Sequence, residues 1–168
     1  MRRLDQLLSS LGYCSRKEAQ ALCDEGRVLV GSEVLDDASR RVDPDQVKLD
    51  DEPLEFPNGL LVMLHKPVGL VCSHDEKEGP RVYDLLPERW QQRDPKVTSI
   101  GRLDKDSDGL VLLTNDGELT HDDLFALADA LWAYPVHECR MAAVELLVAR
   151  PKLIALADVP WLYNTLRD

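Results

Sequence analysis

At 168 residues the chain has room for one ordinary domain, or for a small domain and a medium one. A hydrophobic fraction of 44% is enough for a packed core and excludes a disordered chain, and no apolar run approaches the roughly 20 residues that span a bilayer. No apolar signal region follows the N-terminus, so we expect a cytoplasmic protein with no membrane partner. The formal net charge of −11 means that binding to nucleic acid would depend on a few clustered basic residues.

Two short helices are predicted for the N-terminal segment. Four leucines follow the spacing of an amphipathic helix, namely Leu4, Leu7, Leu8 and Leu11. Gly12 ends this helix, and Ser15 with Glu18 forms a capping box that starts a second helix, which ends at Gly26. Short strands are predicted at 28–30, 33–35 and 47–50, and the first two form a hairpin.

The order of these elements resembles the small alpha-L RNA-binding domain that is shared with a primary ribosomal protein of the small subunit. The resemblance covers residues 1–52 and implies that the second helix and the turn before it present basic side chains to RNA phosphates. The corresponding basic residues are Arg2, Arg3, Arg16, Lys17 and Arg27. Without the resemblance, the same residues would be read as an ordinary solvated helix face.

A linker is predicted at residues 53–59, where two prolines and a glycine stand among polar side chains. An apolar run of strand length follows at 60–64, and after it comes a turn with the sequence His65-Lys66-Pro67-Val68-Gly69. The charged segment 88–96 is expected to be an exposed loop. A strand at 97–100 then leads into the most informative stretch of the chain.

That stretch runs from Gly101 to Gly117. A cation and a carboxylate, Arg102 and Asp104, flank one leucine, and a polar turn separates them from the apolar residues 110–113, which predict a buried strand. Polar residues just before a buried strand are held rigidly, so this pair is a candidate anion clamp with a nucleophile or base. The alternative from composition alone is an ion pair on a surface loop.

The stretch closely resembles, without a gap, the catalytic motif of the RsuA-type pseudouridine synthases, which modify ribosomal RNA. The resemblance implies that Asp104 is the essential catalytic residue and that Arg102 pairs with it. It leaves open whether the carboxylate acts as a nucleophile or as a base. A lysine-proline-x-glycine turn also recurs in this family, so Lys66 is expected to contact an RNA phosphate or a catalytic carboxylate, or else to be an ordinary lysine at a strand end.

No metal site or cofactor is expected. The four cysteines are scattered without a CxxC pair, and His65 and His74 have no partner at a metal-ligand spacing. The reaction that the resemblance implies needs no cofactor, because the same closed site breaks one bond between base and sugar and makes another.

The resemblance ends near residue 121. The family's lysine-x-tyrosine motif, whose tyrosine stacks on the base, and its later basic motif are not recognisable in residues 122–168. This acidic segment is expected to be an atypical, mostly helical tail that protease cuts after Ala133 before it cuts the motif. If the tail does supply a substitute wall for the base, Tyr134 and Tyr163 are the first residues to test.

These observations predict an α+β architecture. An alpha-L RNA-binding domain (1–52) and a linker (53–59) precede a shortened, mainly antiparallel-sheet pseudouridine synthase domain, with its N-terminal part at 60–121 and the tail at 122–168. The expected function is the aspartate-dependent isomerisation of a specific uridine in ribosomal RNA, with the small subunit favoured, by a monomer. One alternative is a catalytically inactive remnant that binds RNA through its N-terminal domain, and another is an unrelated enzyme that uses Asp104 as a base.

Overall fold

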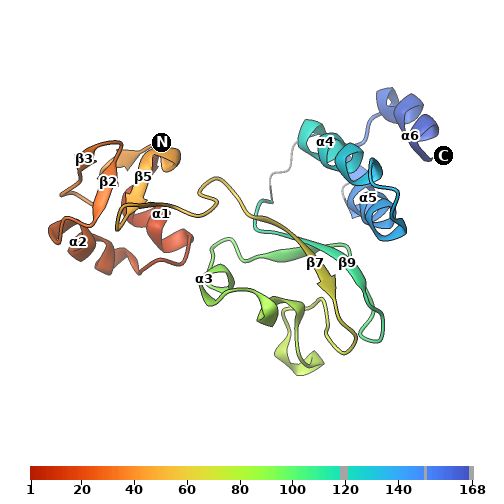
Figure 1. The fold of residues 1–168 in the computed structure, drawn as a ribbon, viewed down its shortest axis with the longest axis horizontal. Coiled ribbons are helices and arrows are strands. Elements are labelled where there is room, and N and C mark those ends of the chain that lie inside the picture. Colours follow the sequence, from red (N-terminus) through yellow and green to blue (C-terminus); the bar gives the residue numbers. More distant parts are fainter. Residues whose placement is uncertain (118–120, 150, 167–168) are drawn as a thin grey trace. The chain divides into compact units, whose positions relative to one another are not determined.

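The computed structural model describes residues 1–117, 121–149 and 151–166 and divides the chain into two compact units (Figure 1). The first unit combines Met1–Leu60 with Tyr83–Val97, and the second combines Leu61–Val82 with Thr98–Asp168. The backbone therefore passes from one unit to the other three times. The boundaries expected from the sequence differ from this division, because residues 83–97 belong with the N-terminal unit.

The first unit contains the two predicted helices, α1 (Leu4–Ser10) and α2 (Arg16–Asp24). The predicted capping box is confirmed, since the Ser15 hydroxyl accepts from the Glu18 amide at 3.3 Å and a Glu18 carboxyl oxygen accepts from the Ser15 amide at 2.8 Å. All four leucines of the predicted amphipathic face are buried in the core of this unit.

Short antiparallel strands complete the first unit. A four-stranded sheet has the order β3-β2-β5-β6, formed by Glu33–Val34, Val28–Val30, Val47–Leu49 and Glu52–Pro53. A separate pair joins β1 (Arg2–Arg3) to β4 (Arg41–Val42). The predicted hairpin is confirmed, with Leu29 opposite Val34.

Residues 88–96, predicted as an exposed loop, are mostly exposed, but together with residues 83–87 and 97 they are tied to the first unit. They include the helix α3 (Glu88–Gln91), and the side chain of Arg93 is only 2% exposed because it donates hydrogen bonds to the backbone carbonyls of Glu55 and Phe56. Glu55 also accepts from the Trp90 indole at 2.9 Å and forms an ion pair with Arg89. The charges of this segment therefore hold it to the first unit.

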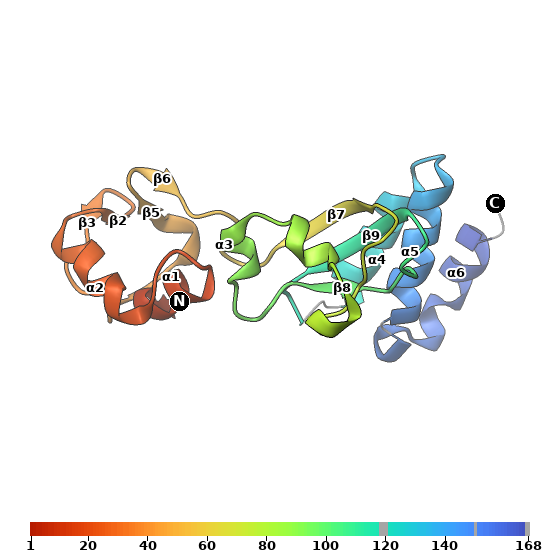
Figure 2. The ribbon, with the colours of Figure 1, turned by 90° about the horizontal axis from the view of Figure 1, so that it is seen from below.

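The second unit is built on a three-stranded antiparallel sheet with the order β7-β9-β8, formed by Leu61–Lys66, Gly109–Thr114 and Thr98–Ile100 (Figure 2). Leu64 lies opposite Val111 on one side of the central strand, and Ile100 lies opposite Leu112 on the other. The central strand β9 lies within the stretch from Gly101 to Gly117 and directly follows its polar residues 101–108, so the burial of β9 fixes one end of that polar loop.

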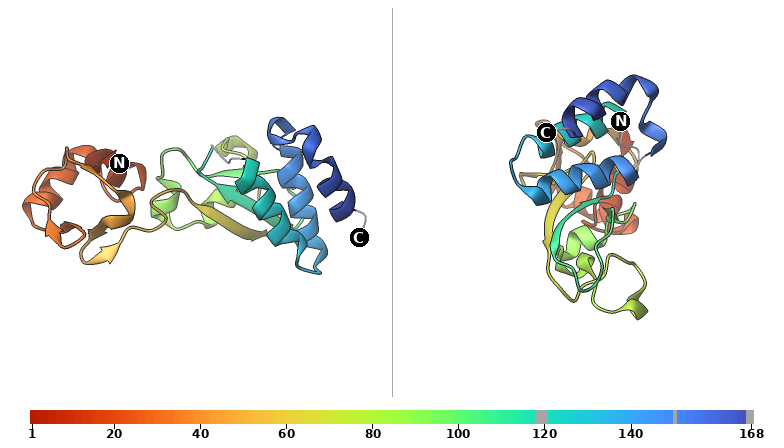
Figure 3. Two further views of the ribbon diagram at one scale, coloured as in Figure 1. Left: turned by 90° about the horizontal axis from the view of Figure 1, so that it is seen from above. Right: turned by 90° about the vertical axis from the view of Figure 1, so that its right-hand side faces the viewer.

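Helices follow the sheet, namely α4 (His121–Trp132), α5 (His137–Ala149) and α6 (Val159–Leu166). Figure 3 shows α4 and α5 beside one another, and α5 packs against β8 and β9. Together with the sheet they bury one core, made of Ile100, Leu112, Leu124, Ala128, Leu131, Ala142, Ala143, Leu146 and Leu147. The tail is mostly helical, as expected, but α4 and α5 are a packed part of the second unit.

The last helix is joined to α4 by aromatic and polar contacts. The Trp161 indole donates to a carboxyl oxygen of Asp129 at 2.9 Å, and its ring lies edge-on to Phe125 with centroids 4.9 Å apart. His121 places one ring nitrogen 3.0 Å from Asp122 and the other 2.9 Å from Asp158. Among the residues described, none of the helices is long and apolar enough to cross a membrane.

Candidate active site

The candidate catalytic loop, residues 101–108, connects β8 to β9. Gly101 has a φ of +79°, a conformation that side chains with a Cβ rarely adopt. A turn closed by a 3.1 Å hydrogen bond from the Ser107 amide to the Asp104 carbonyl shapes the middle of the loop, and the Gly69 amide donates to the Lys105 carbonyl at 2.7 Å. The backbone of the loop is therefore fixed both within itself and from the turn after β7.

Asp104 and Arg102 are both exposed on this loop. Neither side chain has a hydrogen bond or an ion pair with any residue that the structure describes. The expected pairing of the two is thus not formed here, and it stays a prediction for the RNA complex. An exposed carboxylate on a fixed backbone is available to a substrate without first breaking an internal contact.

Lys66, at the end of β7, is placed differently from the expectation. Its side chain is 0% exposed, and its ammonium group donates to the backbone carbonyls of Pro67 at 3.2 Å, Lys105 at 3.4 Å and Ser107 at 2.5 Å. A phosphate cannot reach a group that is enclosed in this way, so the predicted RNA contact of Lys66 is wrong. The lysine instead fixes the backbone of the catalytic loop, because two of the three carbonyls that accept from its ammonium group belong to that loop.

The predicted RNA-binding residues of the first unit fall into two groups. Arg16 and Lys17 are exposed in the first turn of α2 and have no ion pair with any described residue. Arg3 pairs with Asp5 at 2.9 Å, Arg27 makes two 2.7 Å hydrogen bonds to Asp50, and Arg2 donates to Ser10 at 2.9 Å. A phosphate would have to displace these partners, so Arg16 and Lys17 are the better placed cations.

One residue beside the loop carries no signal in the sequence. Glu145 of α5 approaches Gly101 so closely that a Cβ at position 101 would clash with its carboxyl oxygen. Partial burial raises the pKa of Glu145. Only the packing of α5 on β8 and β9 brings this carboxyl to the loop, so no local motif could have identified it.

Metal-ligating side chains do not gather in the described part of the chain, where no three His, Cys, Asp or Glu residues are grouped to hold an ion. All four cysteines are free thiols. Burial raises the pKa of Cys14 to about 11, which keeps this thiol protonated near neutral pH.

Two family models match successive parts of the chain. Residues 2–48 match the S4 domain, and residues 60–123 match the RNA pseudouridylate synthase domain. The second match contains β7, the candidate loop and β9, so it covers Asp104 and Lys66 together.

Curated relatives are named as RNA pseudouridine synthases, some of them as uncharacterized ones. RNA pseudouridine synthase YtzG of Bacillus subtilis is 36% identical over 137 residues, which are 80% of this chain and 56% of that protein. Dual-specificity RNA pseudouridine synthase RluF of Salmonella typhi is 35% identical over 74% of this chain and 42% of its own length. Ribosomal small subunit pseudouridine synthase A of Vibrio parahaemolyticus is 37% identical over 71% and 50%, respectively.

The chain spans about half the length of the curated relatives that it matches. A crystal structure of a pseudouridylate synthase is 28% identical and aligns with 74% of this chain and 55% of its own, but a TM-score of 0.31 is too low for the arrangements to be compared. The two family models and the named relatives nevertheless agree: the chain is similar to an S4 domain over residues 2–48 and to an RNA pseudouridylate synthase domain over residues 60–123.

Proposed function

We propose that this protein converts a specific uridine of ribosomal RNA into pseudouridine, with Asp104 as the catalytic residue. The observation that carries the proposal is the loop 101–108, which lies inside the matched synthase domain and presents an exposed aspartate on a fixed backbone. Small-subunit RNA is the favoured target, since one relative is named for that subunit. The cytoplasm, where such RNA is found, is the proposed location, and the protein works as a monomer without metal or cofactor.

The reaction breaks the bond between N1 of uracil and C1′ of the ribose and forms a bond between C5 and C1′. The proton on C5 is lost and N1 gains one, so the reaction is a balanced isomerisation. The Asp104 carboxylate acts at the sugar, either by attacking C1′ or by removing the neighbouring proton from C2′. The target nucleotide must first leave the RNA stack, because these atoms are otherwise covered.

Two residues support Asp104 in this proposal. Lys66 fixes the loop through the carbonyls of Lys105 and Ser107, which flank the turn that contains the aspartate. Positioning of this kind matters because a displacement of about 1 Å can lower a rate by on the order of a hundredfold. Arg102, exposed two residues away, pairs with the carboxylate or with an RNA phosphate once the substrate excludes water.

The first unit supplies RNA affinity through Arg16 and Lys17. Both stand in the first turn of α2, where the helix dipole also favours phosphate oxygens. Arg2, Arg3 and Arg27 contribute less, since each already has a partner within the unit. In a chain whose net charge is −11, RNA affinity thus depends on these few cations of one small surface.

The test is release of tritium from carbon 5 of uridine in unmodified ribosomal RNA. Wild-type protein should release it, and Asp104→Asn, which keeps the size and removes the carboxylate, should not. Asp106→Asn is the matched control, because Asp106 is an exposed aspartate of the same loop with no assigned role. Release by Asp104→Asn at the wild-type rate would remove the catalytic assignment.

RNA binding without turnover is the second candidate function. The observation in its favour is that the match to the synthase domain ends at residue 123 and that the lysine-x-tyrosine motif is not recognisable in residues 122–168. Filter binding of the same RNA separates the two candidates: RNA that is bound but never loses tritium supports the second.

A further inference from the structure

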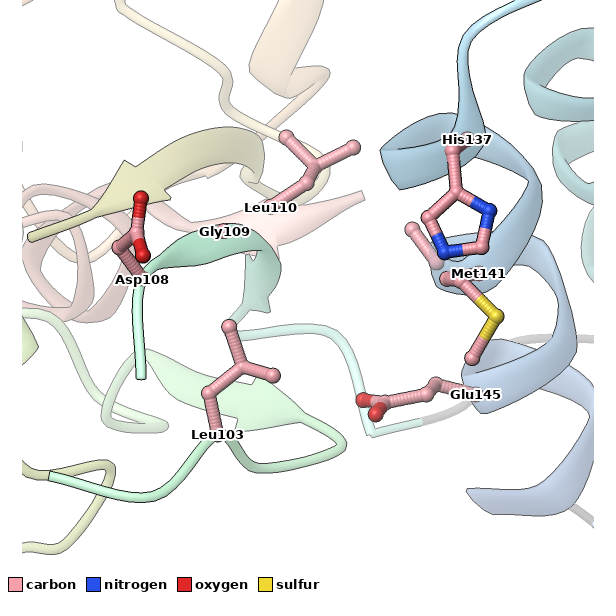
Figure 4. A pocket seen from close by; sticks show the side chains of 8 residues that line it. Leu103, Asp108, Gly109, Leu110, His137, Met141 and Glu145 are labelled. Carbon is pink, nitrogen blue, oxygen red and sulfur yellow. The ribbon is translucent and has the colours of Figure 1, made fainter. Parts of the chain in front are cut away.

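A cavity of about 230 Å³ lies between the catalytic loop and helix α5 (Figure 4). Leu103 and Leu110 line it from the loop and β9, and His137, Met141 and Glu145 line it from α5. The volume is below the roughly 300–1,000 Å³ of sites that take drug-sized ligands, so the cavity suits one ring with its substituents. Leu103 is the residue before Asp104, so the cavity borders the backbone of the catalytic loop one residue from the proposed catalytic aspartate, whose own side chain does not line it.

The ionisable side chains that line the cavity are Asp108, from the end of the catalytic loop, and His137 and Glu145, from α5. Figure 4 shows Glu145 extending from α5 toward Leu103, with His137 and Met141 on the preceding turns of the same helix. The Glu145 carboxyl is half-buried and has no hydrogen bond or ion pair with any residue that the structure describes. A desolvated acceptor without a partner is costly, and a ligand that donates a hydrogen bond would relieve that cost.

We propose that this cavity receives the uracil ring of the extruded target nucleotide and that Glu145 recognises its N3–H. The inference rests on the proposed function, since that function defines the ring. A carboxyl oxygen of Glu145 accepts from N3–H, and the His137 imidazole, two turns away on α5, contacts the nucleoside at the other end of the cavity. Leu103 and Met141 contact the faces of the ring, as apolar side chains do around flipped bases.

The arrangement explains how uridine would be distinguished from cytidine. Uracil carries a donor at N3, whereas cytosine carries a lone pair there, which would face the Glu145 carboxylate. Sites built to hydrogen-bond a substrate N–H strongly reject an analogue that lacks it, because the buried acceptor is then left unpaired. Glu145 is thus a specificity-determining residue in this proposal.

The wall that α5 provides is this chain's own. Helix α5 lies beyond residue 123, where the match to the synthase domain ends. Tyr134 and Tyr163, the aromatic residues that the sequence suggested for this purpose, are 61% and 64% exposed and do not line the cavity. Met141 and Glu145 line this side of the cavity instead.

Methyl labelling of methionine offers a direct test. The chain has three methionines, of which Met141 lines the cavity and Met63 is an exposed residue of β7 outside it. NMR titrations with uridine and with cytidine, at about pH 8 to favour the ionised carboxylate, should shift the Met141 methyl signal and leave that of Met63 unchanged. Uridine should bind at least about tenfold more tightly than cytidine.

Substitutions then test which side chains cause the preference for uridine over cytidine. Glu145→Gln should weaken uridine binding by about tenfold, the effect of one charged hydrogen bond. It should also reduce the difference in affinity between uridine and cytidine, because the Gln amide can donate to N3 of cytosine. His137→Ala, at an exposed position that tolerates truncation, should weaken uridine binding by about threefold. Glu76→Gln is the matched control, since Glu76 is an exposed carboxylate of the same unit away from the cavity, and its uridine affinity should equal that of the wild type.

Equal binding of the two nucleosides, or a Met141 signal that does not respond, would overturn the proposal. Tritium release by the wild type together with unchanged uridine binding in Glu145→Gln would reject the cavity and leave the proposed function standing. Uridine binding that depends on Glu145, without any tritium release, would support the cavity as a uracil site and reject the proposed function. Asp104→Asn should keep uridine binding in either case, which separates recognition from catalysis.

Discussion

Replacing Lys66 with methionine tests whether this lysine holds the catalytic loop or binds RNA. The substitution keeps the buried aliphatic chain and removes the ammonium group. The Lys105 carbonyl would still accept from the Gly69 amide, but the carbonyls of Pro67 and Ser107 would lose the donor that they have in this structure.

Each buried acceptor left without a donor costs about 1–3 kcal/mol, and the ammonium no longer has to be desolvated, so we expect a net loss of about 2–3 kcal/mol in the free energy of unfolding. A loop displaced by about 1 Å should also lower pseudouridine formation by about a hundredfold. Urea unfolding and tritium release measure the two effects. Lys105→Met is the matched control, because Lys105 is an exposed lysine of the same loop.

RNA affinity provides the discriminating measurement. A lysine that contacts a phosphate adds roughly 0.7–0.9 to the slope of log K against log salt. Lys66 is enclosed, so Lys66→Met should leave that slope unchanged. A lower slope with full stability would refute the account of Lys66 as the support of the loop and restore it as an RNA contact.

Three further predictions follow from the packing and the charges. Arg16→Ala combined with Lys17→Ala should weaken RNA binding and reduce its salt slope by roughly 1.5–2, which filter binding at several salt concentrations would show. Leu146→Ala, in the core shared by α5 and the sheet, should cost about 2–5 kcal/mol in urea unfolding, whereas a loosely attached tail would tolerate it. Contact with Asp122 and Asp158 raises the pKa of His121. The stability that this contact provides is therefore present below the ordinary histidine pKa and is lost as the pH rises through the raised value. Fluorescence of Trp161 should report the release of α6, and His121→Gln should abolish this pH dependence.

Local patterns predicted much of the first unit. The leucine spacing of α1 and the capping box of α2 are complete within a few residues, so the sequence alone contained the information needed for both helices. In the second unit the same holds for β9, whose apolar residues follow the polar part of the motif directly. Asp104 was identified by a resemblance that covers the whole loop, and no long-range contact was needed to propose it.

Other features depend on partners far along the chain. Arg93 is charged and lies in a charged segment, and only the carbonyls of Glu55 and Phe56 explain why it is buried. Lys66 is similar, since its acceptors at Lys105 and Ser107 lie about forty residues away. The tail was expected to be mostly helical, but α5 was not identified as a separate helix, because its apolar residues are nearly continuous from Ala142 to Val148 and hide the helical period.

The three passages of the backbone between the units bear on how genes of this kind recombine. An RNA-binding module that is joined at one point can be lost or exchanged by a single crossover. Here a crossover near residue 60 would remove Glu55 and Phe56 and leave Arg93 on the retained piece without its two carbonyl acceptors. Exchange of the N-terminal module therefore requires residues 83–97 to be inherited with it, so these two distant stretches should descend together and vary in concert.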